Sequence, residues 1–365
     1  MRPEAVEAML PFMTEVFANP SGSHRFARQA RKSIDEARDV IADAIGCKPG
    51  EIVFTGCGTE SDNTAITGVI RRTPGVAVCS ATEHHAVLHC VEHANGVVVG
   101  VNELGTINLE ALQAALTPDV ASVSVMAVNN ETGVITDLAA VSKLVRRYAP
   151  QAMLHTDAVQ ATCWQDLREI SKLVDVLSVS AHKFGGPKGM GITMQRLGLE
   201  IDPLIVGGGQ ERDRRSGTHN VAGIMATAAA LRATDSSRDA EVARVTKLRD
   251  ALVDGVMSEI EDVIETVPRD KRVAGIAHMC IGDCESESVL YLLDEAMICA
   301  SAASACASGA MEPSHVLTAM GVDKKYSMGA LRMSLGHTTT ESDIDRAISA
   351  LVGVVRQLRR NKVKA

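Results

Sequence analysis

Apolar residues in the first half of the chain fall into short β-branched runs, and segments with helical spacing separate several of these runs. Strands that alternate with helices in this way are typical of a parallel, doubly wound sheet with helices on both faces. The predicted fold class is therefore α/β. The expected strands cover residues 52–55, 76–79, 97–101, 123–128, 153–155 and 174–179.

Helices are predicted where apolar residues recur at steps of three and four. The clearest stripe runs from Phe26 to Ala44 and is followed by Gly46, a residue type that commonly ends helices. Near the C-terminus, Thr340 and Asp343 form a capping box at the start of a last helix. The other expected helices cover residues 2–17, 109–116, 138–148 and 240–264.

At 365 residues the chain is long enough for two domains. We expect a large domain over residues 13–235 and a smaller α+β domain made of residues 1–12 and 236–365. The smaller domain contains a stretch of Ala, Ser and Gly at about 300–312 that surrounds Cys306. Because such side chains bury almost nothing, we expect a mobile loop with an exposed thiol, and exposure is what a reactive thiol needs.

The composition argues against a nucleic-acid or membrane role. Aromatic residues make up 2% of the chain and the net charge is −8, which disfavours base stacking and binding to a phosphate backbone. No apolar run reaches the roughly 18–20 residues of a membrane span, and no signal-peptide pattern opens the chain. A cytoplasmic location is expected.

The nine cysteines are scattered and include no C-x-x-C pair, so they do not indicate a disulfide scaffold. The spacing of the last four matches no zinc pattern, and no metal is expected. Most of the nine should be small buried hydrophobes. The last four are Cys280, Cys284, Cys299 and Cys306.

Polar clusters follow four of the expected strands. The carboxyl ends of strands in a doubly wound sheet meet at one edge, and ligands bind there. Taken singly, each cluster has an ordinary explanation as a loop, turn or cap, but four of them converge on one edge. The clusters are Thr82-Glu83-His84-His85, Asn129-Asn130-Glu131-Thr132-Gly133, Asp157-Ala158-Val159-Gln160 and Ala181-His182-Lys183.

Lys183 stands where a buried strand ends, a position that is unusual for a lysine. A lysine held in a dry pocket loses its proton more easily and becomes a nucleophilic amine. The alternative is an ordinary solvated strand exit. Ser180 and His182 beside it are short polar donors of the kind that can hold a phosphate.

Two further segments suit an anion. In residues 56–62, a glycine turn leads from a strand into a helix whose expected N-cap is Thr59, and the free N–H groups of such a helix start attract anions. The segment lacks the G-x-G-x-x-G pattern of dinucleotide sites. Residues 207–218 form a basic, Gly-rich loop that also suits an anion, although a solvated surface loop is the alternative.

Pyridoxal phosphate chemistry needs the groups that converge here: a lysine, a carboxylate for the ring nitrogen, a flat group on the ring face and donors for the phosphate. Asp157 and Lys183 lie about one strand–helix–strand crossover apart, so they can flank one ring. Further along, Arg332 stands in an apolar setting and provides a fork for a substrate carboxylate.

With these motifs together, the chain resembles the cysteine desulfurases of the NifS/IscS type, which are fold-type I pyridoxal phosphate enzymes. The resemblance runs from about residue 3 to about residue 355. The ordered set of motifs is specific, although each motif alone is weak. It comprises Asn19-Pro20-Ser21 with His24, Gly58-Thr59-Glu60-Ser61, Glu83-His84 with Ala86-Val87, Asn129-Asn130-Glu131-Thr132-Gly133, Asp157-Ala158-Val159-Gln160, Ser180-Ala181-His182-Lys183, Arg215-Ser216-Gly217-Thr218, Ser304-Ala305-Cys306 and Glu312-Pro313-Ser314-His315-Val316-Leu317.

The resemblance implies a role for each candidate residue toward pyridoxal 5′-phosphate. Lys183 would form the Schiff base, Asp157 would pair with the pyridinium nitrogen, and His84 would stack on the ring. Gln160 would contact the ring hydroxyl, and Asn130 would lie beside the cofactor. The phosphate would be held by Gly58, Thr59, Ser180 and His182, with Thr218 reaching it from the second subunit of a homodimer.

The resemblance also implies the reaction. Asn130 and Arg332 would bind the carboxylate of L-cysteine, and the freed Lys183 would shuttle the Cα proton. Cys306 would attack the substrate sulfur, keep it as a persulfide and release alanine. The long cysteine loop resembles that of enzymes that supply iron–sulfur scaffold proteins, so such a scaffold or another sulfur acceptor is the expected partner.

One departure from the family pattern leaves alternatives open. Family members usually begin with a strand near the substrate, whereas this chain starts just after that strand should end. We expect a misassigned start or a truncated chain. The alternatives are a selenocysteine lyase or other pyridoxal phosphate lyase on the same fold, and a weakly catalytic sulfur-relay or assembly partner.

Overall fold

The computed structural model describes residues 1–302 and 313–364, so Cys306 lies outside the described residues. The chain divides into two compact units. Unit 1 consists of Met1–Val99, Asn108–Ala127 and Thr136–Arg238, and unit 2 consists of Gly100–Ile107, Val128–Ile135 and Asp239–Ala365.

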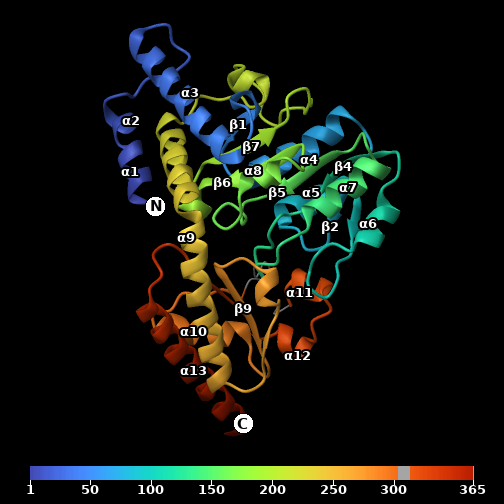
Figure 1. The fold of residues 1–365 in the computed structure, drawn as a ribbon, viewed down its shortest axis with the longest axis vertical. Helices are drawn as coiled ribbons and strands as arrows, with labels where there is room; N and C mark the ends of the chain where they lie inside the picture. The colour runs from blue at the N-terminus through green and yellow to red at the C-terminus, as the bar shows by residue number, and fades with distance from the viewer. Residues whose placement is uncertain (303–312, 365) are drawn as a thin grey trace. The chain divides into compact units, whose positions relative to one another are not determined.

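Unit 1 is built on a seven-stranded sheet in the order β1-β7-β6-β5-β4-β2-β3 (Figure 1). The strands from β6 to β3 in this order pair in parallel, whereas β7 runs antiparallel to both β6 and β1. The predicted, mainly parallel α/β sheet is confirmed, and β7 is an additional strand. The strands are β1 (Ile52–Thr55), β2 (Val76–Ser80), β3 (Val97–Val99), β4 (Val120–Ser124), β5 (Met153–Asp157), β6 (Val176–Ser180) and β7 (Gly191–Gln195).

The helices of unit 1 follow the predicted stripes, with one interruption. The stretch predicted as one helix over residues 2–17 forms two short helices, because Pro11 cannot donate a hydrogen bond to the preceding turn. The stripe of α3 is buried, and Gly46 ends this helix in the left-handed conformation, at φ +77°. The helices are α1 (Pro3–Met9), α2 (Pro11–Thr14), α3 (Arg25–Ile45), α4 (Gly58–Arg72), α5 (His85–His93), α6 (Leu109–Ala115), α7 (Leu138–Tyr148) and α8 (Leu167–Ser171).

The N-terminal residues differ from the expected domain division. Residues 1–12 group with unit 1, not with the smaller unit. Two hydrogen bonds join this segment to unit 1: Arg2 N donates to Gly185 O at 2.8 Å, and Arg2 Nε donates to Phe184 O at 3.2 Å. These bonds attach the start of the chain to the turn that carries Lys183.

Helix α4 is fixed by its apolar face. Ala65 and Val69 pack with Ala121, Met153 and other buried residues of the sheet. This packing sets the N-terminus of α4 at the carboxyl end of β1, where Gly58 lies close to β6.

Unit 2 contains the three-stranded antiparallel sheet β10-β9-β8 and a core that includes Val134, Cys280 and Leu317. Helix α9 (Val221–Glu259) enters it at Asp239, so the helix predicted over 240–264 starts earlier and ends earlier. The other elements are β8 (Val263–Glu265), β9 (Ile276–Ile281), α10 (Ser286–Glu295), α11 (His315–Ala319), α12 (Lys324–Ser327), β10 (Ala330–Ser334) and α13 (Glu341–Lys364).

The predicted capping box of the last helix is confirmed. Thr340 N donates to Asp343 Oδ2 at 2.9 Å, and Asp343 N donates to Thr340 Oγ1 at 3.2 Å. Within the described ranges, no helix has both the length and the apolar character needed to cross a bilayer.

Candidate active site

The lysine turn follows β6 directly. Residues Ala181–Phe184 form a single 3-10 turn, which Gly185 ends at φ +87°. Lys183 and His182 lie exposed on this turn, beyond the carboxyl end of a fully buried strand. Among the described residues of the single chain, Lys183 is therefore exposed, as the alternative of a solvated strand exit predicts.

Asp157 is the last residue of β5, and it pairs across the ladder with Ser178 of β6. The carboxyl group is buried, and its Oδ1 accepts a hydrogen bond from Val159 N at 2.8 Å. Burial raises the pKa of Asp157 to about 6, against the opposing effects of the Val159 N–H and of the charge on Lys183. The structure therefore brings Asp157 and Lys183 within electrostatic reach of each other.

The start of α4 forms a cradle for an anion. A Cβ atom at Gly58 would lie 3.2 Å from Ser180 Cβ and 3.1 Å from Val159 Cγ2, so a larger residue here would push these neighbours away by a few tenths of an ångström. Ser180 Oγ lies 3.0 Å from His182 Nδ1. Partial burial of the ring, followed by the charge of Lys183, lowers the pKa of His182, which favours the neutral imidazole. Free N–H groups of the first helical turn and these two side chains match the needs of a phosphate.

The N-cap of this helix differs from the prediction. Cys57 caps α4, with its Sγ accepting from Glu60 N at 3.5 Å, whereas Thr59 lies exposed in the first turn. Cys57 has the extended backbone that an N-cap requires, at φ −173° and ψ 174°. Thr59 keeps its place at the helix start but not the capping role.

His84 and Gln160 lie on the turns that follow β2 and β5. His84 caps α5, because its Nδ1 accepts from Ala86 N at 3.1 Å, and the residue is exposed. Gln160 is half-buried, three residues after Asp157. Thr218 is exposed at the end of the 207–218 loop.

The 207–218 loop is not merely a solvated surface loop, because Glu211 anchors it. The Glu211 carboxylate is buried and accepts from Arg38 at 2.6 and 2.8 Å, from His219 Nε2 at 2.7 Å and from Phe54 N at 2.9 Å. Burial alone would raise the pKa of Glu211, but hydrogen bonds from His219 and Arg38 lower it to about 2. Nearer Thr218, Arg215 Nε donates to Glu60 Oε1 at 2.9 Å.

A layer of buried titratable residues behind Asp157 was not predicted. His155 lies between two hydroxyl groups, with Nδ1 2.7 Å from Ser124 Oγ and Nε2 2.9 Å from Ser178 Oγ. Asp62 Oδ1 is 3.6 Å from His155 Nε2. Burial lowers the pKa of His155 to about 3, and burial raises the pKa values of Asp62 and Glu83 well above their usual range. Asp62 belongs to the 56–62 segment that the sequence singles out, but its burial arises only when α4 packs on the sheet.

The candidate residues for a substrate carboxylate lie in unit 2. Arg332, on β10, donates from Nη1 to Asn130 O at 2.7 Å, so these two predicted residues are in direct contact. Burial lowers the pKa of Arg332, and the charge of Glu131 raises it. Glu131 is buried and accepts a hydrogen bond from Ser314 Oγ. Glu131 and Ser314 belong to two of the motifs that carry the resemblance, which implies no role for either residue.

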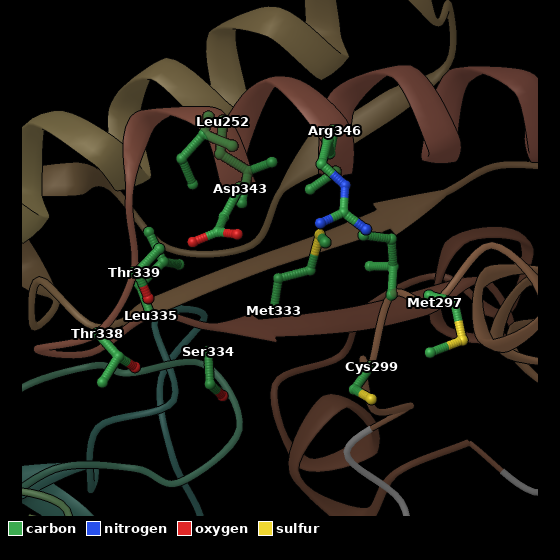
Figure 2. Close-up of a pocket in the computed structure, with 13 residues that line it drawn as sticks. Leu252, Met297, Cys299, Met333, Ser334, Leu335, Thr338, Thr339, Asp343 and Arg346 are labelled. Atoms are coloured by element: carbon green, nitrogen blue, oxygen red, sulfur yellow. The ribbon is translucent and has the colours of Figure 1, made fainter.

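Unit 2 also contains a cavity of about 230 Å³ (Figure 2). Asp343 and Arg346 of α13 line it together with Met333 of β10 and Cys299. None of its lining residues is a predicted site residue. Of the cysteines considered for a metal, Cys280 and Cys284 are buried and Cys299 is exposed.

Comparison with known proteins gives consistent matches over the whole chain. The aminotransferase class-V family profile matches residues 1–347. An "IscS-like cysteine desulfurase" of Mycobacterium tuberculosis is 41% identical over 380 residues, covering 100% of this chain and 96% of the relative. Among solved structures, a "NIFS-LIKE PROTEIN" is 33% identical with a TM-score of 0.91, covering 98% of this chain and 96% of that chain. "SspA in complex with cysteine" is 28% identical with a TM-score of 0.79, covering 93% of this chain and 97% of that chain.

Proposed function

The chain belongs to the aminotransferase class-V family and, within it, to the cysteine desulfurases, and we propose that it removes sulfur from L-cysteine with the residues described above. The resemblance found in the sequence is thereby confirmed. The observation that supports this reaction most directly is that a buried carboxyl, Asp157, lies within electrostatic reach of Lys183 and close to the Gly58 cradle.

The residues present fit pyridoxal phosphate. The cradle at Gly58 is a space that a Cβ would fill, and the α4 N-terminus with Ser180 and His182 would hold the phosphate. Asp157 is buried with one backbone donor at Oδ1, so its ionised form needs a cation, which a protonated ring nitrogen supplies. Bound there, the cofactor provides an electron sink for negative charge that develops at the substrate Cα.

The remaining roles in the chemistry belong to the chain itself. Lys183 Nζ would hold the cofactor by its aldehyde carbon and, once released, move the proton at the substrate Cα. His84 would support the ring face, and Gln160 would orient the ring hydroxyl. Arg332, with its planar fork, would bind the substrate carboxylate with the help of Asn130.

Cys306, which lies outside the described residues, would take the sulfur. Its thiolate attacks the substrate sulfur, an S–S bond forms as the C–S bond breaks, and a proton replaces sulfur on carbon. L-Cysteine and the Cys306 thiol thus become L-alanine and a Cys306 persulfide. An iron–sulfur scaffold or another acceptor would receive this sulfur. A homodimer in which the partner contributes Thr218, and a cytoplasmic location, stay predictions.

Incubation of the cofactor-loaded protein with L-cysteine tests the reaction. We expect alanine in solution and the mass of one added sulfur atom on the peptide that contains Cys306. Lys183→Ala should slow alanine formation by about 10²–10⁴-fold, because the proton carrier is lost. Cys306→Ser should abolish the added mass. Sustained sulfide release by Cys306→Ala would instead favour a lyase.

A further inference from the structure

The segment that carries Cys306 is attached at both ends to the residues around Arg332. On the N-terminal side, Ser301 N donates to Arg332 O at 3.1 Å, and Arg332 N donates to Ser301 O at 2.7 Å. On the C-terminal side, Ser314 Oγ donates to Glu131 Oε2. The same Oγ caps α11 by accepting from Val316 N at 3.0 Å.

Glu131 lies between the two attachments, because it binds Ser314 through its side chain and follows the residue that Arg332 contacts. Its backbone N donates to Asn129 Oδ1 at 2.9 Å, and it follows Asn130, whose carbonyl accepts from Arg332. The side chain is 3% exposed. Among the described residues, Arg332 Nε has no hydrogen-bond partner, so the guanidinium keeps a donor that the fold does not use.

The Glu131 carboxyl group changes its charge state near neutral pH. Burial raises its pKa to about 7, while the Ser314 hydrogen bond and the charge of Arg332 lower it. His278 of β9, paired with Arg332 across the sheet, does not titrate in this range, because burial and the charges of Arg332 and Arg272 lower its pKa to about 3. Of these two residues, Glu131 is therefore the one whose charge changes around pH 7.

We infer that Glu131 is a positioning residue that couples binding of the substrate carboxylate at Arg332 to the anchor of the segment carrying Cys306. This inference rests on the proposed function, which assigns the carboxylate to Arg332. An ionised Glu131 neutralises Arg332 and repels an incoming carboxylate, whereas a protonated Glu131 leaves the guanidinium available. The group that responds to charge at Arg332 also holds Ser314, the cap of α11.

The sign of the pH effect follows. Carboxylate affinity is highest below the pKa of Glu131 and falls as the pH rises through about 7. L-Alanine is a suitable probe for the cofactor-loaded protein, because it has the carboxylate but no thiol, and the cofactor's absorbance reports its binding. Glu131→Gln removes the titration and keeps an acceptor for Ser314. We expect the dissociation constant of the wild type, divided by that of Glu131→Gln, to rise several-fold between about pH 6 and about pH 8.

Ser314→Ala tests the second half of the coupling. It breaks the bond to Glu131 but leaves the charge next to Arg332. We expect about a tenfold slower addition of sulfur to Cys306 in a single turnover at saturating L-cysteine. The Ser314 bond lowers the pKa of Glu131, so L-alanine affinity is compared well below pH 7, where Glu131 is protonated with or without this bond. There it should stay within about twofold of wild type. Asp323→Ala is the matched control, because Asp323 caps α12 through Lys325 N at 2.7 Å as Ser314 caps α11.

The outcomes separate the possible errors. A ratio that stays constant with pH would overturn the coupling at Arg332 while leaving the proposed function intact. Equal rates of sulfur addition for Ser314→Ala and Asp323→Ala would show that losing a helix cap explains the effect, which would overturn the coupling to the cysteine segment. A wild-type protein whose cofactor spectrum ignores L-alanine at every pH would overturn both this inference and the proposed function.

Discussion

Unit 1 contains two buried acidic sites with opposite electrostatics. Glu211 receives charged and neutral donors from Arg38, His219 and Phe54 N, and its pKa is lowered to about 2. Asp157 receives a backbone N–H from Val159, and its pKa is raised to about 6. Equal burial thus gives a stable ion pair in one place and a poised carboxyl in the other.

The difference lies in the number of donors that the fold supplies. Around Asp157, Asp62 and Glu83 add two more buried carboxyls, and Asp62 Oδ1 has no hydrogen-bond partner among the described residues. Buried polar atoms without partners cost stability. The Glu211 carboxylate has its donors within the described residues, whereas we propose that a cation from outside the chain completes the Asp157 site.

Asp157→Asn should have the largest effect. We expect alanine formation to fall by about a thousandfold, because the amide cannot stabilise a protonated ring nitrogen. The cofactor-free protein should not lose stability. A raised pKa means that Asp157 contributes stability below the usual pKa of aspartate, and this contribution is lost as the pH rises through about 6, a loss that asparagine avoids. Wild-type turnover by this variant would contradict the assignment.

Glu211→Gln should have the next largest effect, on stability. Because Arg38 would lose its buried partner, we expect the free energy of unfolding in urea to fall by about 3 kcal/mol at pH 7. The lowered pKa gives the opposite sign: this stability is present above the usual pKa of glutamate and is lost as the pH falls through about 2. The matched control is Glu200→Gln, which breaks an exposed pair with Arg72 and should cost less than about 1 kcal/mol. Equal losses of unfolding free energy for the two variants would refute the claim that the buried Arg38–Glu211 pair stabilises the fold more than an exposed pair does.

Asp62→Asn should have the smallest effect. The raised pKa of Asp62 favours its neutral form, so an amide of the same shape should change the free energy of unfolding by less than about 1 kcal/mol. The same urea titration measures it. A loss of unfolding free energy as large as that of Glu211→Gln would mean that Asp62 is ionised. The Asp157 site and the Glu211 site would then both contain an ionised buried carboxylate, contrary to the comparison.

The sequence predicted the part of the site that depends on sheet topology. Asp157 and Lys183 follow adjacent parallel strands, and hydrophobic periodicity was sufficient to locate those strands. The N-cap of α4 could not be predicted from the sequence. Both Cys57 and Thr59 can cap a helix, and only the backbone angles decide which of them does. The choice of cap changes which N–H groups remain for an anion.

Burial that arises from distant contacts could not be predicted either. Glu211 stands in a polar, Gly-rich segment and resembles a solvated residue, but its partner Arg38 is 173 positions away in the sequence. His155 and Asp62 likewise meet only after β5 and α4 have packed. Such residues have no local signature, because their environment is created by the tertiary fold.

The Glu211 anchor has a consequence for assembly of the chain with itself. Strand β1 is the terminal strand of the sheet, and unpaired backbone groups on such a strand can recruit strands from other molecules. Here Glu211 occupies the N–H of Phe54, and Arg38 donates to Ile52 O at 2.7 Å. The same side chains that fix the 207–218 loop therefore protect the free edge of β1 from pairing with strands of other molecules. Such pairing is a route to amyloid-like aggregation.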